Sequence, residues 1–161
     1  MSVTISGSGQ IVKQVIQVVK SDTFSTTSAS FVPITGLSVN ITPTNSANKI
    51  LVIVDVVTGQ ASSGNNVTLQ MQRNGSAIYA GNAADSRSVG ITGGNQSSDT
   101  TLTTTAMYLD SPATTSSTTY SVSALTSSGG TMYVNRSGDD TDIYYRGRTA
   151  SSITVMEIAY A

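Results

Sequence analysis

The sequence predicts an all-β protein, built as an antiparallel two-sheet sandwich of the jelly-roll kind. Its 161 residues fall into short segments rich in Val, Ile, Thr and Tyr, separated by Gly, Ser, Asn and Asp. The first group favours strands and the second favours turns. Lys occurs three times and Glu once, although surface helices use both heavily. We expect about nine or ten short strands and no helical crossovers, so the sheets should be antiparallel.

The segment KILVIVDVVT, Lys49 to Thr58, should be the central strand. Ile50 to Val54 are consecutive apolar residues, nearly all β-branched, and side chains of that shape suit a pleated strand better than a helix. A run without polar alternation is typical of a strand that is buried on both faces. We therefore expect strands on either side of this segment and side chains packed above and below it.

The N-terminal region is predicted as an extended arm, residues 1–13, followed by the sandwich domain, residues 14–161. Residues 1–10 are small, polar and rich in Gly, with Val3 and Ile5 as their apolar anchors; a disordered terminus is the alternative. The stretch Ile11 to Val19 is ambiguous, because its apolar spacing fits one face of a helix better than the period of two of a strand. Its β-branched residues favour a strand over Val15 to Val19, with a short helix from Ile11 as the alternative.

The middle of the chain carries a clear hairpin signal. Asn74-Gly75 separates two alternating segments, and Asn-Gly favours the type I′ turn that joins two strands. Upstream, Leu37 to Thr42 alternates strictly, while Pro33 confines its own segment to a sheet edge or a strand end. The long polar stretch Gly81 to Asp99 should be either a functional loop or an irregular strand. Further strands are expected at Thr101 to Leu109, Thr118 to Leu125, Thr131 to Asn135 and Ser152 to Ala159.

Composition argues against several classes of function. The chain has no Cys and no His, which removes disulfides, thiolate metal sites and the usual general base. A net charge of −1 gives no basic footprint for nucleic acid, and no apolar run reaches the roughly 20 residues of a membrane span. Asp55 should accept a hydrogen bond from a neighbouring Thr or Tyr, or pair with an Arg. We expect neither catalysis nor a cofactor.

Two polar segments are candidates for binding. Asp139, Asp140 and Asp142 form the acidic cluster, which resembles part of a calcium loop but lacks the bidentate Glu; an exposed turn without metal is favoured. Tyr and Arg dominate interaction hot spots, and both are concentrated just downstream. The candidate partner contacts are Val3, Ile5, Tyr144, Tyr145, Arg146 and Arg148. The alternative for the Tyr and Arg residues is a solvated loop whose rings lie on the sandwich.

The second half of the chain resembles a family of virion structural proteins of bacteriophages, common among phages of marine and freshwater bacteria. The motifs that carry the resemblance are Leu109 to Pro112, Thr118 to Tyr120, Met132 to Arg136 and Ser151 to Ile158. The resemblance implies a jelly roll like the heads of tumour-necrosis-factor-like and complement-type trimers. It further implies a homotrimer in the virion, assembled in the bacterial host cytoplasm.

The resemblance leaves two roles open. The first is a capsid decoration, or cement, protein whose partner is another virion protein, above all the major capsid protein. The second is a tail-fibre or spike tip that binds a host surface receptor. We expect the first, because the chain has almost nothing besides the domain.

Overall fold

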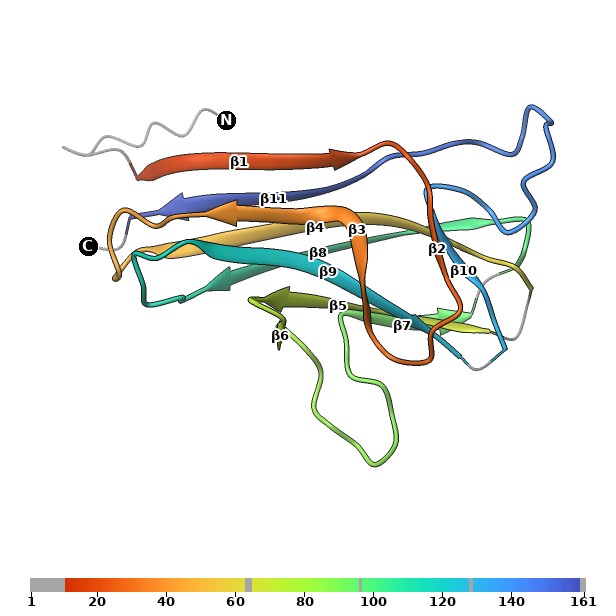
Figure 1. The fold of residues 1–161 in the computed structure, drawn as a ribbon, viewed down its shortest axis with the longest axis horizontal. Helices are drawn as coiled ribbons and strands as arrows, with labels where there is room; N and C mark the ends of the chain where they lie inside the picture. The colour runs from red at the N-terminus through yellow and green to blue at the C-terminus, as the bar shows by residue number, and fades with distance from the viewer. Residues whose placement is uncertain (1–10, 63–64, 96, 128, 160–161) are drawn as a thin grey trace, which may run out of the picture.

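A computed structural model describes residues 11–62, 65–95, 97–127 and 129–159 (Figure 1). These residues form two antiparallel sheets packed face to face, and none of them is helical. The all-β sandwich predicted from the sequence is therefore confirmed. Within the same residues, no helix is long and apolar enough to cross a membrane.

The first sheet, sheet A, is organised around the predicted central strand. Its members are β1 (Val12–Lys20), β2 (Phe24–Thr26), β4 (Lys49–Gln60), β8 (Thr101–Asp110), β10 (Met132–Val134) and β11 (Ser151–Ile158). Along one edge, β4 pairs first with β11 and then with β10; along the other edge it pairs with β8. The strand order β1-β11-β4-β8 places β1 and β8 at opposite margins of the sheet.

The second sheet, sheet B, has the order β3-β9-β5, with β6 and β7 both paired to β5. Its members are β3 (Val32–Ile41), β5 (Asn66–Arg73), β6 (Ser76–Ile78), β7 (Thr92–Asn95) and β9 (Thr118–Thr126). From β3 to β5 and again from β7 to β11, the long strands alternate between the two sheets. The chain therefore wraps around the sandwich, as in a jelly roll.

The hydrophobic core lies between the sheets and consists of every second side chain along each long strand. In β4 the inward residues are Ile50, Val52 and Val54, all fully buried. They meet Leu37 and Val122 from sheet B, which are also fully buried. Each such aliphatic side chain stabilises the fold by roughly 1.5–3 kcal/mol relative to exposure in water.

The ambiguous N-terminal segment is a strand, and the helical alternative from Ile11 is wrong. β1 pairs with β11 over its whole length, for example Val15 opposite Met156 and Val18 opposite Ile153. Even-numbered side chains from 14 to 20 turn inward and odd-numbered ones outward. Pairing with β11 therefore produces a strand here, as the β-branched residues predicted, although the apolar spacing fits a helix better.

The Asn74-Gly75 turn has the predicted conformation. Asn74 has φ 49° and Gly75 has φ 81°, the positive pair that a type I′ hairpin requires between β5 and β6. Pro33 lies in β3, an edge strand, as expected. The two segments predicted around it are, however, one strand whose register shifts between Pro33 and Ser38.

Two short strands have no clear signal in the sequence. β2, in the hydroxyl-rich stretch after β1, was not predicted and pairs with β10. β7 pairs with β5 and agrees with the irregular strand that was one of the two alternatives for the long polar stretch. Neither shows a periodic apolar pattern, because β2 has three residues and β7 reads TGGN. Their pairing depends on where the fold places their backbones, and no pattern of side chains in the sequence predicts it.

Buried polar groups fasten the sandwich at one end. Glu157 of β11 is fully buried and accepts hydrogen bonds from Asn48 Nδ2 at 2.6 Å, Gln14 Nε2 at 2.7 Å and the Thr44 amide at 2.7 Å. Burial alone would raise the pKa of Glu157, but the hydrogen bonds from Asn48, Gln14 and Thr44 outweigh it and lower this pKa to about 2. The single Glu of the chain thus ties β11 to β1 and to the turn before β4.

Candidate interaction surfaces

The outward side of β1, β11, β4 and β8 forms an apolar surface, which we call the apolar face. Strand pairing aligns its residues in rows across the sheet. One row contains Val15, Met156, Leu51 and Leu109; the next contains Gln17, Thr154, Ile53 and Met107. Val19 and Ile158 extend the face along the strands, and Asp55 lies on β4 one row beyond Ile53.

The side chains at the two margins of the apolar face are more than half exposed. Their exposed fractions are 55% for Val15, 58% for Val19, 61% for Met107 and 53% for Leu109. In the centre, Leu51 and Ile53 are half-buried by their neighbours in the sheet. The prediction that this strand is buried on both faces is therefore wrong for the single chain. Sheet B covers one face, and between Lys49 and Asp55 the outward side chains of the other face are partly exposed.

The outward side of sheet B, which we call the polar face, has the opposite character. Its outward residues are Ser38, Asn40, Gln70, Gln72, Thr119, Ser121 and Ser123. They bond to one another: Thr119 Oγ1 donates to Asn40 Oδ1 at 2.6 Å, and Ser123 Oγ donates to Gln72 Oε1 at 2.8 Å. Several polar groups of this face therefore bond within it, and none of the exposed large apolar side chains of the described residues lies on β3, β5 or β9.

The residues 136–148, which we call the arginine loop, join β10 to β11. Arg146 is its centre: the guanidinium lies 2.9 Å from Asp139 Oδ2 and 3.1 Å from Asp99 Oδ1, and it donates to the Asp99 carbonyl at 3.0 Å. Only 10% of the Arg146 side chain is exposed. Of the predicted contact residues, Arg146 is thus occupied inside the loop and offers little to a partner.

The other predicted contact residues that the structure describes lie at the surface of this loop. Tyr144 is 98% exposed, and its ring meets that of Tyr145 edge-on at 5.2 Å. Arg148 is exposed and binds Asp140 at 2.7 Å. The alternative in which the rings lie on the sandwich does not hold for Tyr144. Val3 and Ile5 lie outside the described residues, and their contact role stays a prediction.

The acidic cluster is compensated by arginine. Asp139 accepts hydrogen bonds from both the Thr141 hydroxyl and the Thr141 amide, and these bonds, followed by Arg146, lower the pKa of Asp139. Asp140 pairs with Arg148 and approaches Arg136 at 3.8 Å. Among the described residues, no three acidic, His or Cys side chains gather in a way that could hold a metal ion. That the cluster binds no metal remains a prediction.

Asp55 has the hydrogen bond expected from the sequence, since Thr105 Oγ1 donates to its Oδ1 at 3.2 Å. Both residues face outward, on neighbouring strands. A carboxylate beside a threonine hydroxyl gives a base and an alcohol, but nucleophilic catalysis also needs a group that orients the base, and this pair lies on the outward side of the sheet.

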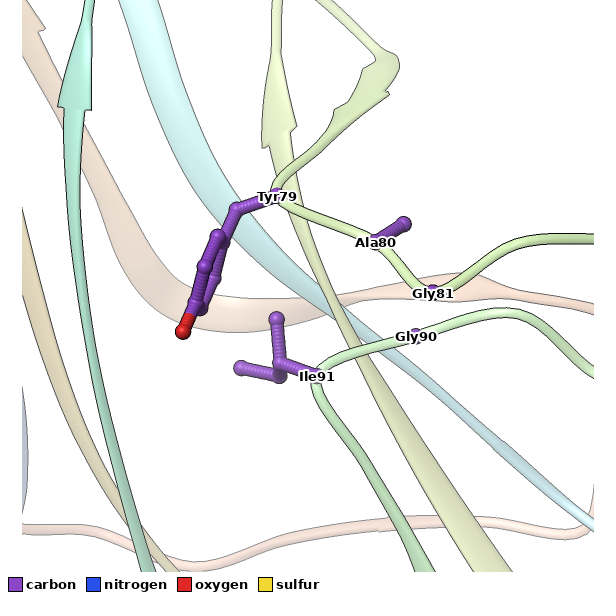
Figure 2. Close-up of a pocket in the computed structure, with 5 residues that line it drawn as sticks. All are labelled: Tyr79, Ala80, Gly81, Gly90 and Ile91. Carbon is purple, nitrogen blue, oxygen red and sulfur yellow. The ribbon is translucent and has the colours of Figure 1, made fainter.

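A hollow of about 300 Å³ lies where the long segment between β6 and β7 begins and returns. Figure 2 shows the Tyr79 ring and the Ile91 side chain extending to the same side of it, with Ala80, Gly81 and Gly90 completing the lining. Tyr79 stacks on Tyr108 at 5.3 Å and has φ 49°, an uncommon conformation for an aromatic residue. Tyr79 and this hollow were not singled out from the sequence.

Comparisons with known proteins give little guidance. No protein-family model matches the chain, and no curated protein matches it. Among solved structures, one chain from the structure of infectious bursal disease virus, Gx strain, has a TM-score of 0.48 and 16% sequence identity. The match covers 90% of this chain but 42% of the other. A likeness of this degree is too weak to assign a function.

Proposed function

We propose that the chain is a non-enzymatic structural protein of a bacteriophage virion, and that it acts as a homotrimeric capsid decoration protein bound to the major capsid protein. The apolar face is the observation that carries this proposal. Eight apolar side chains project outward from four adjacent strands on one side of a sandwich whose other side is polar. Soluble monomers rarely leave a contiguous apolar patch of this kind uncovered.

The resemblance to phage virion proteins supports the same conclusion from the sequence. Its motifs fall on or directly after β8, β9, β10 and β11, and all four strands contribute side chains to the core. The proposed role is therefore one of assembly, and it requires no enzymatic step from any residue.

The decisive measurement is the number of copies in each virion, from quantitative gel analysis or electron cryomicroscopy of purified particles. Hundreds of copies are expected for a protein that decorates the capsid. A few copies, up to a few dozen, would contradict decoration and would favour the fibre-tip alternative. Light scattering of the purified protein tests the homotrimer separately: a monomer at micromolar concentration would overturn it.

We propose further that the N-terminal arm, with Val3 and Ile5, attaches the protein to the virion. Deleting residues 1–10 should leave the trimer intact and weaken binding to particles that lack the protein. Full-strength binding of the truncated protein would contradict the role of the arm. It would direct attention to Tyr144, Tyr145 and Arg148, which are the exposed contact candidates on the arginine loop.

The alternative function is a trimeric fibre or spike tip that binds a host glycan or surface protein. Its specific support is the hollow beside Tyr79, because an exposed aromatic ring in a strained backbone conformation is common at binding sites. If this alternative holds, Tyr79→Ala should reduce adsorption of phage to host cells without changing particle assembly. Unchanged adsorption would count against it.

A further inference from the structure

We propose that copies of this chain associate through the apolar face, with the β1 margin of one copy against the β8 margin of the next. The inference deepens the proposed homotrimer and rests on it. The β1 margin consists of Val15 and Val19, and the β8 margin consists of Met107 and Leu109. These four are the most exposed apolar side chains of the face.

The size of the face argues against the N-terminal arm as its cover. From β1 to β8 the face is four strands wide, and it extends over the seven β4 residues from Lys49 to Asp55. At about 4.8 Å per strand and about 3.3 Å per residue, it measures roughly 440 Å². An extended segment of ten residues covers the width of about one strand. The apolar side chains of residues 1–10 are Met1, Val3 and Ile5, fewer than the four apolar side chains of the two margins.

A second copy supplies the matching surface. An apolar margin is best covered by another apolar surface, and the exposed aliphatic side chains of the described residues are concentrated on this face and at the adjoining ends of β1 and β8. The partner that can offer several such side chains together is therefore the same face of another copy. Neither β1 nor β8 carries an outward carboxylate, so contact at these margins does not remove an acidic group from water.

The position of Asp55 favours contact at the margins over stacking of whole faces. Asp55 projects outward from β4, in the centre of the sheet, where it holds a hydrogen bond from Thr105. Stacking one entire face on another would remove this carboxylate from water, which is costly for a charged group. A β1-to-β8 contact is heterologous, and three such contacts close into a ring that covers both margins of every copy.

Cysteine crosslinking tests this arrangement directly, because the natural chain has no Cys. Val15 and Leu109 occupy one row but are separated by three strand spacings, roughly 14 Å. A disulfide requires Cα atoms within about 7 Å, so these two positions cannot be bridged within one chain. Any disulfide between them must join two copies.

The variants are Val15→Cys, Leu109→Cys and the double variant, each treated with oxidant and, in parallel, with a short bis-maleimide that tolerates an offset of one row. The double variant should form covalent dimers and trimers, and each single variant should remain uncrosslinked. Crosslinking of a single variant would overturn the inference in favour of a two-fold, like-with-like contact. A wild-type trimer without any crosslinking would overturn this contact but not the trimer, whereas a wild-type monomer would overturn both.

A charge placed at the β8 margin gives an independent measurement. Leu109→Lys should reduce the mass measured by light scattering to that of the single chain, because a buried ammonium would oppose the contact. Ser38→Lys places the same charge on the polar face and should leave the trimer mass unchanged. Circular dichroism should show both variants folded, since Leu109 and Ser38 are exposed in the single chain. If Leu109→Lys and Met107→Lys both leave the trimer mass unchanged, the inference is contradicted.

Discussion

The outward side chains of sheets A and B differ, although both sheets follow the same pleat. Along β9 and β5 of sheet B, the residues that alternate with the core are Ser, Thr and Gln, and they bond to one another and to Asn40. Along β4 of sheet A, the corresponding residues are Leu51 and Ile53, between the apolar margins of β1 and β8. The polar face is complete within one chain, whereas the apolar face has the composition of a core.

This difference shows that the side-chain pattern of a strand depends on what packs against each of its two faces. A half-buried antiparallel strand normally alternates apolar and polar residues, and β9 does so. From Ile50 to Val54, β4 is apolar on both sides, which is typical of a strand with packed layers above and below it. One of those layers is sheet B. The proposed contact between copies lies on the same face, at the β1 and β8 margins, so the outward side chains of β4 lie between the two contact regions.

The largest expected effect compares the two sides of β4 in a chain kept monomeric by Leu109→Lys. Ile50→Ala removes a fully buried side chain from the core and should lower the free energy of unfolding by roughly 2–5 kcal/mol. Ile53→Ala, on the half-buried outward side, should cost less than about 1 kcal/mol. Urea denaturation measures both values. Equal costs would show that the apolar face is already covered within the single chain.

Much of the fold was predictable because its signals are local. Asn74-Gly75 fixed a hairpin, and the alternation of Tyr120 with Val122 and Ala124 placed β9 correctly. What local pattern could not provide was pairing between distant segments. The secondary structure of β1 was ambiguous from its sequence, and its pairing with β11 makes it a strand. β2 and β7 are too short to show a periodic pattern of apolar residues.

The candidate surfaces were predictable in part. Residue type pointed to Tyr144 and Tyr145, which are exposed, but it also pointed to Arg146, which is held by Asp99 and Asp139. An ion pair between a loop and a residue about 40–50 positions away has no sequence signature. The apolar face was visible in β4 as a missing alternation. Its continuation onto Val15 and Met107 required the register of four strands.

A second prediction tests the hairpin at the end of sheet B. Gly75 has φ 81°, and a side chain added there would meet open space. Gly75→Val should therefore lower the free energy of unfolding through backbone strain alone, by roughly 1–3 kcal/mol. Gly94→Val is the matched control, because Gly94 also has open space but no positive φ. Thermal melting should separate the two variants. A Gly75→Val protein as stable as wild type would mean that the turn adopts another conformation.

A third prediction concerns Glu157, whose side chain faces inward next to the outward Met156. Its pKa is about 2 in the folded protein, below the ordinary value of 4.5, so the unfolded chain binds its proton at higher pH. The stabilisation is complete above about pH 4.5 and is lost as the pH falls toward 2. Glu157→Gln should cost roughly 1–3 kcal/mol at pH 7, since an amide cannot accept the four hydrogen bonds that Gln14, Asn48 and the amide and hydroxyl of Thr44 donate to the carboxylate.

The Glu157→Gln protein should also lose most of the dependence of stability on pH between 4.5 and 2 that urea denaturation measures in wild type. The mass of the assembly should not change at pH 7, because Glu157 is fully buried and does not reach the apolar face. A variant that retains the wild-type pH dependence in that window would assign the dependence to other carboxylates. A variant that dissociates the trimer would show that the two sides of β11 are coupled.

The smallest expected effect is on the arginine loop, which neither face includes. Asp139 accepts its hydrogen bonds from Thr141 and Arg146, so its negative charge is already balanced without a cation. Chelators and added calcium should therefore leave the melting temperature unchanged. Asp139→Asn should lower stability by the same small amount with and without chelator, because it weakens the pairing with Arg146 and removes no metal ligand. If chelator destabilises wild type but not Asp139→Asn, the carboxylate holds a metal ion, and the loop must rearrange to bind it.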